Sequence, residues 1–206
     1  MAELSELPLH TRLELALYKW RRIDPVPWTP LAVPLRDARV ALVTSAGLYE
    51  LGEDEPFRRM KGGDYSFRIL SADIDVHHFV LGQTAGGFDR EPIVKDRNLA
   101  LPVEPLAELV REHMVGSPAS VHVSFNGAIT APKRLMTETA PRVAERLRED
   151  GVHAAVFIPV CAMCTQSVAL LAAVVEAHGI STTCLALLRD VAEQVRPPRA
   201  LAVPFP

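Results

Sequence analysis

The sequence predicts a single α/β domain whose mostly parallel sheet is covered by helices on both faces. Short apolar segments alternate along the chain with amphipathic ones, glycines follow two of the amphipathic segments, and 206 residues are enough for one sizeable core. Short connections between alternating strands and helices favour a three-layer αβα arrangement of the flavodoxin or Rossmann type. We therefore expect residues 1–206 to form one domain.

The N-terminal part is typical of a helix followed by an extended arm. Apolar residues recur at close to helical spacing over residues 9–22, and the proline-rich stretch IDPVPWTPLAVP comes next. We expect residues 1–36 to contain this helix and arm, outside the sheet.

The middle of the chain contains two expected strands and a long loop. RVALV, at residues 39–43, has the character of a central strand, and residues 65–70 predict a second strand. Residues 82–98 are rich in Gly, Asp, Arg and Pro and show no periodicity. A loop of this length usually carries function or closes over a site.

The C-terminal half alternates strand and helix most regularly. Gly151 and Gly179 follow amphipathic or apolar segments and are typical of helix ends. The expected helices are residues 105–113, 133–150 and 164–178, and the expected strands are residues 121–125, 154–160 and 181–185.

Composition excludes several classes of protein. The net charge is -3 and the basic residues are interleaved with acids, so no stripe of positive charge suits nucleic acid. The first ten residues are acidic and lack the apolar core of a secretory signal, and the longest apolar run is too short to span a bilayer. We expect a cytoplasmic protein. Three cysteines argue against a disulfide scaffold, and Cys184, inside an apolar segment, is expected to be a core residue.

Cys161 and Cys164 carry the clearest chemical signal, in the segment VFIPVCAMCTQS. A C-x-x-C spacing brings two sulfurs within bonding distance across the first helical turn, where unpaired N–H groups and the helix dipole favour a thiolate. Ligand crevices in parallel sheets lie beyond the carboxyl ends of the strands, which is where Cys161 is expected. We therefore predict that Cys161 is a nucleophile and that Cys164 is the resolving thiol, which releases a Cys161 adduct as a disulfide.

Two other interpretations of the pair stay open. Free cysteine is among the most buried residue types, so the pair would merely pack in the core. Alternatively the two thiols would bind zinc, although no second C-x-x-C exists to complete a structural site. The zinc alternative would use Cys161 and Cys164 together with His77, His78 and His122.

Several segments between Val40 and Pro206 occur in an order that is shared with one known family. They are VTSAGLYELGEDEPF, GDYSFRIL, LPVEPLAELV, GSPASVHVSFNGAI, ETAPRVAERLREDGVHAAVFIPVCAMCTQ and PRALAVPFP. On these segments the chain resembles the selenoprotein B family of glycine, sarcosine and betaine reductases, to which D-proline reductase is related.

The resemblance implies roles for the thiols and a place in a complex. In the family's reductases a selenocysteine followed three residues later by cysteine comes after this strand, and the selenolate is implicated in reductive cleavage of a carbon–nitrogen bond. Cys161 occupies the selenocysteine position, which implies that it is the attacking group with Cys164 as its partner. Ser167 stands where some members have a further cysteine. These reductases also depend on a separate pyruvoyl subunit.

Histidines supply the other candidate catalytic groups, because imidazole titrates near neutrality. His77 and His78 precede the long loop, and we expect His78 to act as a general acid and His77 to contact the substrate. His122 lies in the expected strand 121–125, whose carboxyl end should adjoin Cys161, so we expect it to be a partner of the thiolate. A partly exposed histidine pair and a core histidine remain alternative interpretations.

Polar residues after the strands are the candidate substrate ligands. Thr44 and Ser45 follow the first strand and would offer hydroxyls and N–H groups to a carboxylate or phosphate. Asn126 would clamp a polar group at the end of its strand, and Arg97 would pair with a substrate carboxylate through its planar guanidinium. A solvated charge is the commoner outcome for an arginine in a loop.

The sequence thus predicts a thiol-dependent reductase or lyase that cleaves a carbon–heteroatom bond, C–N or similar, in a small molecule. Such an enzyme needs no intrinsic cofactor but requires an external thiol or thioredoxin-type electron donor. Two alternatives stay open: a zinc site for hydrolysis or metal binding, and a non-catalytic subunit that binds a reductase component through its arm and N-terminal helix. Small sheets of this kind commonly pair, so we expect a homodimer.

Overall fold

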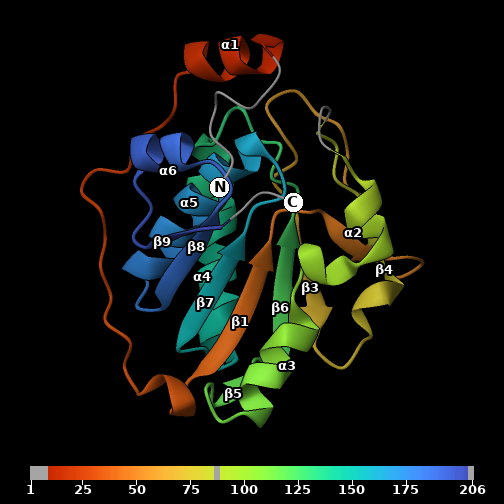
Figure 1. Cartoon of the computed structure of the whole chain (residues 1–206), viewed down its shortest axis with the longest axis vertical. Helices are drawn as coiled ribbons and strands as arrows, with labels where there is room; N and C mark the ends of the chain where they lie inside the picture. The colour runs from red at the N-terminus through yellow and green to blue at the C-terminus, as the bar shows by residue number, and fades with distance from the viewer. Residues whose placement is uncertain (1–8, 86–88, 204–206) are drawn as a thin grey trace.

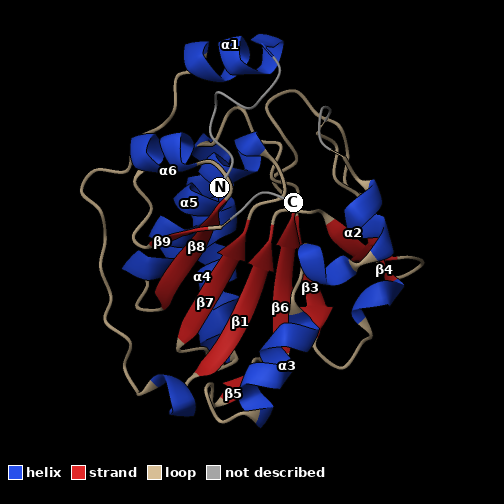
Figure 2. Ribbon diagram, in the orientation of Figure 1, coloured by secondary structure: helices blue, strands red, loops and turns tan. Residues whose placement is uncertain are grey.

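In the part of the chain that the structure describes, a mixed, mostly parallel sheet of seven strands forms the centre, with helices packed on both faces (Figures 1 and 2). The structure is a computed structural model that describes residues 9–85 and 89–203. The predicted α/β class is confirmed. None of the helices in these ranges has the length and apolar character that a membrane crossing needs.

The strand order is β3-β6-β1-β7-β8-β9, and β5 pairs with β1 just before β6 begins. Counted along the chain, the five main parallel strands therefore stand in the order 2-1-3-4-5, which flavodoxin-type sheets share. The strands are β1 Arg39–Thr44, β3 Phe67–Ser71, β5 Ser117–Pro118, β6 Val121–Phe125, β7 Ala154–Ile158, β8 Ser181–Ala186 and β9 Ala200–Ala202.

One strand runs against the others. β3, at the place of the strand predicted for residues 65–70, pairs antiparallel with β6. The chain enters β3 from the carboxyl end of the sheet, since after β1 it stays at that end to form the short strand β2, Leu48–Glu50. β2 pairs antiparallel with β4, Phe79–Leu81, in a small second sheet that was not predicted from the sequence.

The helices agree with prediction where they are long. The helix predicted for residues 133–150 contains one π-helical stretch, η5, before its regular part. The segment 82–98, predicted as a loop, contains two short helices, because five and three residues are too few to show periodicity. The helices are α1 Leu9–Leu17, η2 Leu35–Asp37, η3 Val76–His78, α2 Glu91–Lys95, η4 Arg97–Leu99, α3 Val103–Arg111, η5 Leu135–Thr139, α4 Ala140–Glu149, α5 Ala162–Ala177 and α6 Arg189–Val195.

The central strands are buried on both faces. On one face Val43 and Phe157 pack in a cluster that includes apolar residues of α4 and α5. On the other face Leu42 and Ile158 share a cluster with Leu106 of α3. This double burial explains why β1 and β7 are almost wholly apolar. It leaves only the strand ends for polar chemistry.

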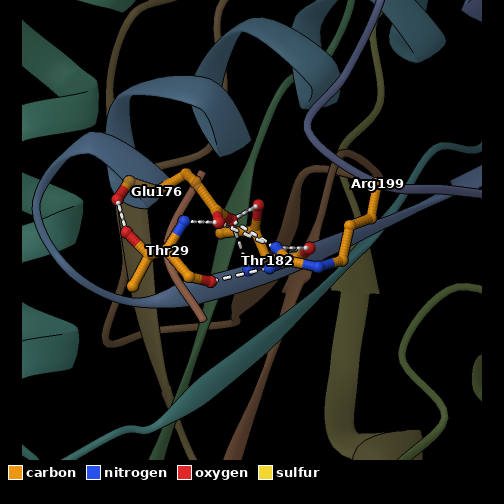
Figure 3. A network of polar contacts seen from close by, with 4 residues as sticks. All are labelled: Thr29, Glu176, Thr182 and Arg199. Atoms are coloured by element: carbon orange, nitrogen blue, oxygen red, sulfur yellow. Dashed lines mark hydrogen bonds and ion pairs between the residues drawn. The ribbon is translucent and has the colours of Figure 1, made fainter. Parts of the chain in front are cut away.

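The N-terminal arm is fixed to the sheet through one buried carboxylate (Figure 3). Glu176, at the end of α5, is fully buried and accepts hydrogen bonds from the N–H of Thr29 in the arm and from the N–H and hydroxyl of Thr182 in β8. Arg199 donates to both Glu176 oxygens, at 2.8 and 2.9 Å, and to the Thr29 carbonyl at 2.6 Å. The arm predicted from the proline-rich stretch therefore packs on its own domain.

α1 lies at the end of the molecule toward which β1, β6 and β7 point (Figure 1). Its Leu15 is buried in a cluster with apolar residues of α5 and α6. The hydroxyl of Tyr18, just after α1, donates to the carbonyl of Thr130 and accepts from the side chain of Gln166 in α5. The N-terminal helix is therefore held near the carboxyl ends of the strands.

Candidate active site

The two cysteines meet at the junction of β7 and α5. Cys161 is the N-cap of α5, and its sulfur accepts a hydrogen bond from the N–H of Cys164 at 3.3 Å. The sulfurs are joined in a disulfide, and the Cα atoms are 5.0 Å apart. Cys161 retains 7% exposure, whereas Cys164 has none. The pair can therefore exist as a disulfide without rearrangement of the helix, and Cys161 is the member nearer to solvent.

The pair lies beyond the carboxyl end of β7, beside the point where the strand order reverses. β1 stands between β6 and β7, which follow it in the chain. The strand order therefore runs one way from β1 to β6 and the opposite way from β1 to β7. Sheets of this order bind ligands outside the carboxyl ends of the strands at such a reversal. Cys161 follows β7 at this point, as the sequence predicted.

Ser45 fixes the turn that leads into the thiol pair. Its hydroxyl donates to the carbonyl of Ile158 and accepts from the N–H of Val160, both at 3.1 Å. The residue is fully buried. Its hydroxyl therefore serves the turn between β7 and α5, and the predicted contact with a substrate stays a prediction.

Gly127 lies against Cys164. A Cβ atom at residue 127 would be 2.7 Å from the Cys164 sulfur, and the Gly127 carbonyl accepts from the Ser167 hydroxyl at 2.8 Å. The carboxyl end of β6 therefore adjoins the thiols, as predicted, although β1 lies between β6 and β7 in the sheet. Ser167, at the position where the resemblance places a further cysteine, binds backbone instead of sulfur.

Gln83 contacts the pair but was not predicted. Its Nε2 donates to the Ser45 carbonyl at 2.6 Å and lies within hydrogen-bonding distance, 3.5 Å, of the Cys164 sulfur. Its Oε1 accepts from the N–H of Ala85 at 3.0 Å, and only 1% of the residue is exposed. The signal in the sequence was weak: Gln83 follows a three-residue strand that could be recognised only through its pairing with β2.

A close crossing of two glycines brings Gln83 to the site. Gly82 donates its N–H to the carbonyl of Gly47 at 2.9 Å, and Gly47 has a φ of +63°. A Cβ atom at Gly82 would be 2.8 Å from that carbonyl oxygen. The loops after β1 and β4 can therefore cross only because both residues lack side chains.

The other predicted substrate ligands are engaged within the protein. The Thr44 hydroxyl accepts from the N–H of Ala46 at 3.2 Å, and Asn126 donates to the hydroxyl of Thr84 at 2.8 Å. Arg97 donates to the carbonyl oxygens of Phe79 and Ile93. Asn126 and Thr44 lie beside the loops around the thiols, whereas Arg97 braces β4 against α2. Their contacts with a substrate stay predictions.

His122 is a buried residue of the sheet. The N–H of Leu42 donates to its Nδ1 at 3.2 Å, and burial, opposed by the charge of Asp150, lowers its pKa to about 4. In the register of the sheet, Ser124 of β6 and Ile158 of β7 stand at the same level, each paired with Thr44 of β1. His122 comes two residues before that level, and Cys161 comes three residues after it. The structure therefore does not bring His122 to the thiols, because the end of β6 and not its middle adjoins them.

His77 and His78 lie apart from the thiols as well. Both are exposed in η3, and Nε2 of His77 is 3.9 Å from a carboxylate oxygen of Glu104 in α3. They precede β4, whose opposite end leads to Gln83. Within the described ranges no group of three or more His, Cys, Asp or Glu side chains is placed to hold a metal ion. This placement gives the alternative zinc site of the two thiols with His77, His78 and His122 no support.

Cys184 is the core residue that its apolar surroundings predicted. It is buried and unpaired in β8, and its sulfur points toward the carbonyl of Val168 in α5. Burial first and the charge of Glu176 second raise the pKa of this thiol far above its ordinary value. It is therefore neutral and takes no part in the site.

Residues 3–159 match a family model described as glycine/sarcosine/betaine reductase selenoprotein B. The chain belongs to this family. The match confirms the resemblance seen in the sequence segments, and it begins closer to the N-terminus than they do. It ends just before the thiol pair.

Curated relatives of the selenoprotein B family extend the similarity over the thiols. D-proline reductase subunit gamma of Acetoanaerobium sticklandii is 32% identical over 200 residues, which are 97% of this chain and 80% of the relative. Sarcosine reductase complex component B subunit beta of Peptoclostridium acidaminophilum is 26% identical, over 89% of this chain and 42% of the relative. Glycine reductase complex component B subunit gamma of Symbiobacterium thermophilum is 28% identical, over 92% of this chain and 44% of the relative.

The chain spans less than half of the length of these sarcosine and glycine reductase components. All three relatives are named as reductase subunits, so the protein is related to components of reductase complexes. No solved structure matches the chain.

Proposed function

We propose that this chain is a thiol-dependent reductase component that cleaves a carbon–heteroatom bond, foremost C–N, in a small molecule. Cys161 is the nucleophile and Cys164 is the resolving thiol. The observation that carries the proposal is the bonded Cys161–Cys164 pair at the start of α5, at the reversal of strand order. The names of the relatives, which are subunits of D-proline, sarcosine and glycine reductases, support the choice of bond.

The reaction balances with one dithiol for each bond cleaved. The Cys161 thiolate attacks the carbon that carries the nitrogen, a C–S bond forms, and the C–N bond breaks as the amine leaves with a proton. The Cys164 thiolate then attacks the Cys161 sulfur, the S–S bond forms, and the carbon takes the electron pair and a second proton. The substrate is reduced by two electrons and the dithiol is oxidised, so an external dithiol must reduce the pair before the next turnover.

The fold supplies the features that this sequence of steps needs. The sulfur of Cys161 lies at the N-terminus of a sixteen-residue helix and accepts the N–H of Cys164, and both effects favour its anionic form. Both sulfurs belong to buried residues, but Cys161 retains 7% exposure and Cys164 has none, so Cys161 is the more accessible of the two. Attack from outside therefore falls on Cys161.

The test uses three single variants of the full chain, C161S, C164S and C184S. With dithiothreitol as donor, cleavage of the C–N bond is measured separately for each protein, as release of methylamine from sarcosine, as release of ammonia from glycine, and as opening of the D-proline ring to a primary amine that stays in the product. C161S should abolish cleavage, C164S should accumulate a covalent adduct that is visible by intact mass, and C184S should behave as the wild type. Wild-type activity in both C161S and C164S would refute the thiol mechanism.

A role as the subunit of a complex is supported by the surface of α1. Leu9, Leu13 and Leu17, spaced four residues apart on one helical face, are 64%, 54% and 81% exposed. Leu15 on the opposite face holds the helix to the domain. We propose that this leucine stripe contacts another reductase component, in agreement with the relatives' names.

The L13E variant tests the leucine stripe, and the wild type and C161S serve as controls. Each is used to capture proteins from cells that make the chain naturally, and the captured proteins are identified by mass spectrometry. L13E should lose a reductase component that both other proteins retain. Equal capture by all three would remove α1 as the contact.

A further inference from the structure

Gln83, which lies outside α5, places a polar side chain against the sulfur of Cys164, the proposed resolving thiol. Its amide nitrogen lies 3.5 Å from the Cys164 sulfur, and Cys164 itself is fully buried. A thiolate at a buried position is disfavoured unless a donor faces it. An amide N–H provides such a donor without adding charge.

The carboxamide of Gln83 is fixed before any reaction takes place. Its nitrogen donates to the Ser45 carbonyl at 2.6 Å, its oxygen accepts from the Ala85 N–H at 3.0 Å, and the guanidinium of Arg90 donates to its main-chain carbonyl. The contact with Ala85 requires the oxygen to face that N–H, which turns the nitrogen toward Ser45 and Cys164. The donor is therefore oriented by the fold, and no reorientation is needed when charge develops on the sulfur.

The same contacts link Gln83 to the turn that carries Cys161. Ser45 accepts from Gln83 through its carbonyl and binds Ile158 and Val160 through its hydroxyl. Ser45 thus sets the distance between the side-chain amide of Gln83 and the start of α5. The position of Gln83 relative to the thiols follows from this chain of hydrogen bonds.

We propose that Gln83 activates Cys164 as the resolving thiol by donating a hydrogen bond to its sulfur when that sulfur is anionic. The proposal rests on the proposed function, in which Cys164 attacks a Cys161 adduct. It assigns Gln83 to the second step alone, since its amide contacts Cys164 and not Cys161. The first attack, by Cys161, proceeds without it.

An aromatic disulfide separates the two steps without any natural substrate. The Cys161 thiolate attacks one sulfur of dithiobis-nitrobenzoate, a mixed disulfide with Cys161 forms, the S–S bond of the reagent breaks, and one nitrothiobenzoate leaves. The Cys164 thiolate then attacks the Cys161 sulfur of this adduct, the intramolecular disulfide forms, and a second nitrothiobenzoate leaves. The reagent takes up two electrons and the dithiol is oxidised. Stopped-flow absorbance of the reduced full chain resolves the two releases.

The variants are Q83L, which lacks the donor, and Q83E, which keeps the acceptor for Ala85 but presents a negative charge to the sulfur. Q83L should slow the second release about tenfold, the size expected for one lost hydrogen bond to an ionised group, and leave the first unchanged. Q83E should slow the second release further, because a like charge disfavours the thiolate.

Q166L is the matched control. Gln166, near the start of α5, is also a fully buried glutamine, but its side chain accepts from the N–H of Arg21 and donates to the hydroxyl of Tyr18 instead of contacting sulfur. Both releases should keep their wild-type rates in Q166L. Thermal unfolding of each reduced variant shows that it is folded before its rates are compared.

The outcomes distinguish the two proposals. An unchanged second release in Q83L, or equal slowing of both releases, would overturn the role of Gln83 and leave the proposed function standing. A wild-type protein that shows no first release dependent on Cys161 would overturn the proposed function, and the role of Gln83 with it.

Discussion

Gly127 and Cys164 approach so closely that a Cβ atom on residue 127 would lie 2.7 Å from the cysteine sulfur. It would also lie 2.6 Å from Cβ of Ser45, and real Cβ atoms essentially never come within 3.0 Å of a neighbour. The absence of a side chain at the end of β6 is therefore a condition for the position of the resolving thiol. Any larger residue must displace either the sulfur or the turn held by Ser45.

G127A should destabilise the protein and disturb the thiol pair together. Overpacking of a filled site costs about 1–3 kcal/mol, which urea unfolding measures. Displacement of Cys164 should also lower the equilibrium constant for disulfide formation, measured against glutathione.

G151A is the control for the stability loss. Gly151 has a φ of +68° with no atom near an added Cβ, so its alanine costs about 1 kcal/mol through backbone strain alone. The disulfide equilibrium should stay at its wild-type value in G151A. If G127A also left it unchanged, the close contact would not govern the thiols.

Cys184 should be inert in the folded protein. Burial raises the pKa of its thiol, and only thiolates are alkylated at an appreciable rate. In the C161S/C164S double variant, iodoacetamide should add no label under native conditions and one label in urea, as counted by intact mass. Labelling at the same rate in both conditions would mean that β8 opens readily.

The thiol site was largely predictable because its signals are local. The C-x-x-C spacing and an apolar strand followed by a helix predicted Cys161 at a strand end, and the parallel sheet predicted that the carboxyl end of strand 121–125 would lie near it. Gln83 was not predictable in this way. It reaches Cys164 through the crossing of Gly47 and Gly82, which depends on a pairing between two three-residue strands.

Residue type and position in the chain predicted the histidines at the site, but neither gives the level of a side chain in the sheet. His122 lies in β6, which ends just before Asn126, and the register of the strand places it beside Leu42. β3 was predicted as a strand without its direction, because five residues are too few to distinguish the alternation common in antiparallel strands from the continuous apolar run of a buried parallel strand. Short elements such as α2 and β9 contain too few residues for periodicity to appear.

E176Q should loosen the N-terminal arm. The buried Glu176 carboxylate accepts from Arg199, from the N–H of Thr29 and from Thr182, and loss of its charge weakens the hydrogen bonds from Arg199 by about 2 kcal/mol. Trypsin should then cleave faster after Arg21 and Arg22, at the start of the arm, and urea unfolding should report the lower stability.

E149Q tests whether the effect is specific to the buried network. Glu149 pairs with Arg146 at 3.3 Å on the surface, where its side chain is 57% exposed, so the same substitution should cost well under 1 kcal/mol. The rate of cleavage in the arm should stay at the wild-type value. Comparable cleavage in both variants would show that the Glu176 network does not hold the arm.

The protein should lose stability in mild acid because His122 binds a proton more readily in the unfolded chain than in the folded protein. Burial lowers its folded-state pKa from 6.5 to about 4, so between these values the unfolded chain binds a proton that the folded protein does not. The contribution of His122 is fully present above pH 6.5 and is lost as the pH falls, by about 2 kcal/mol at pH 5 and about 3 kcal/mol at pH 4. H122Q, whose amide oxygen can still accept from the N–H of Leu42 but does not titrate, should flatten the dependence of urea unfolding on pH between 7 and 5. H78Q, at an exposed position, should retain it, and an equally steep dependence in H122Q would assign the acid sensitivity to other groups.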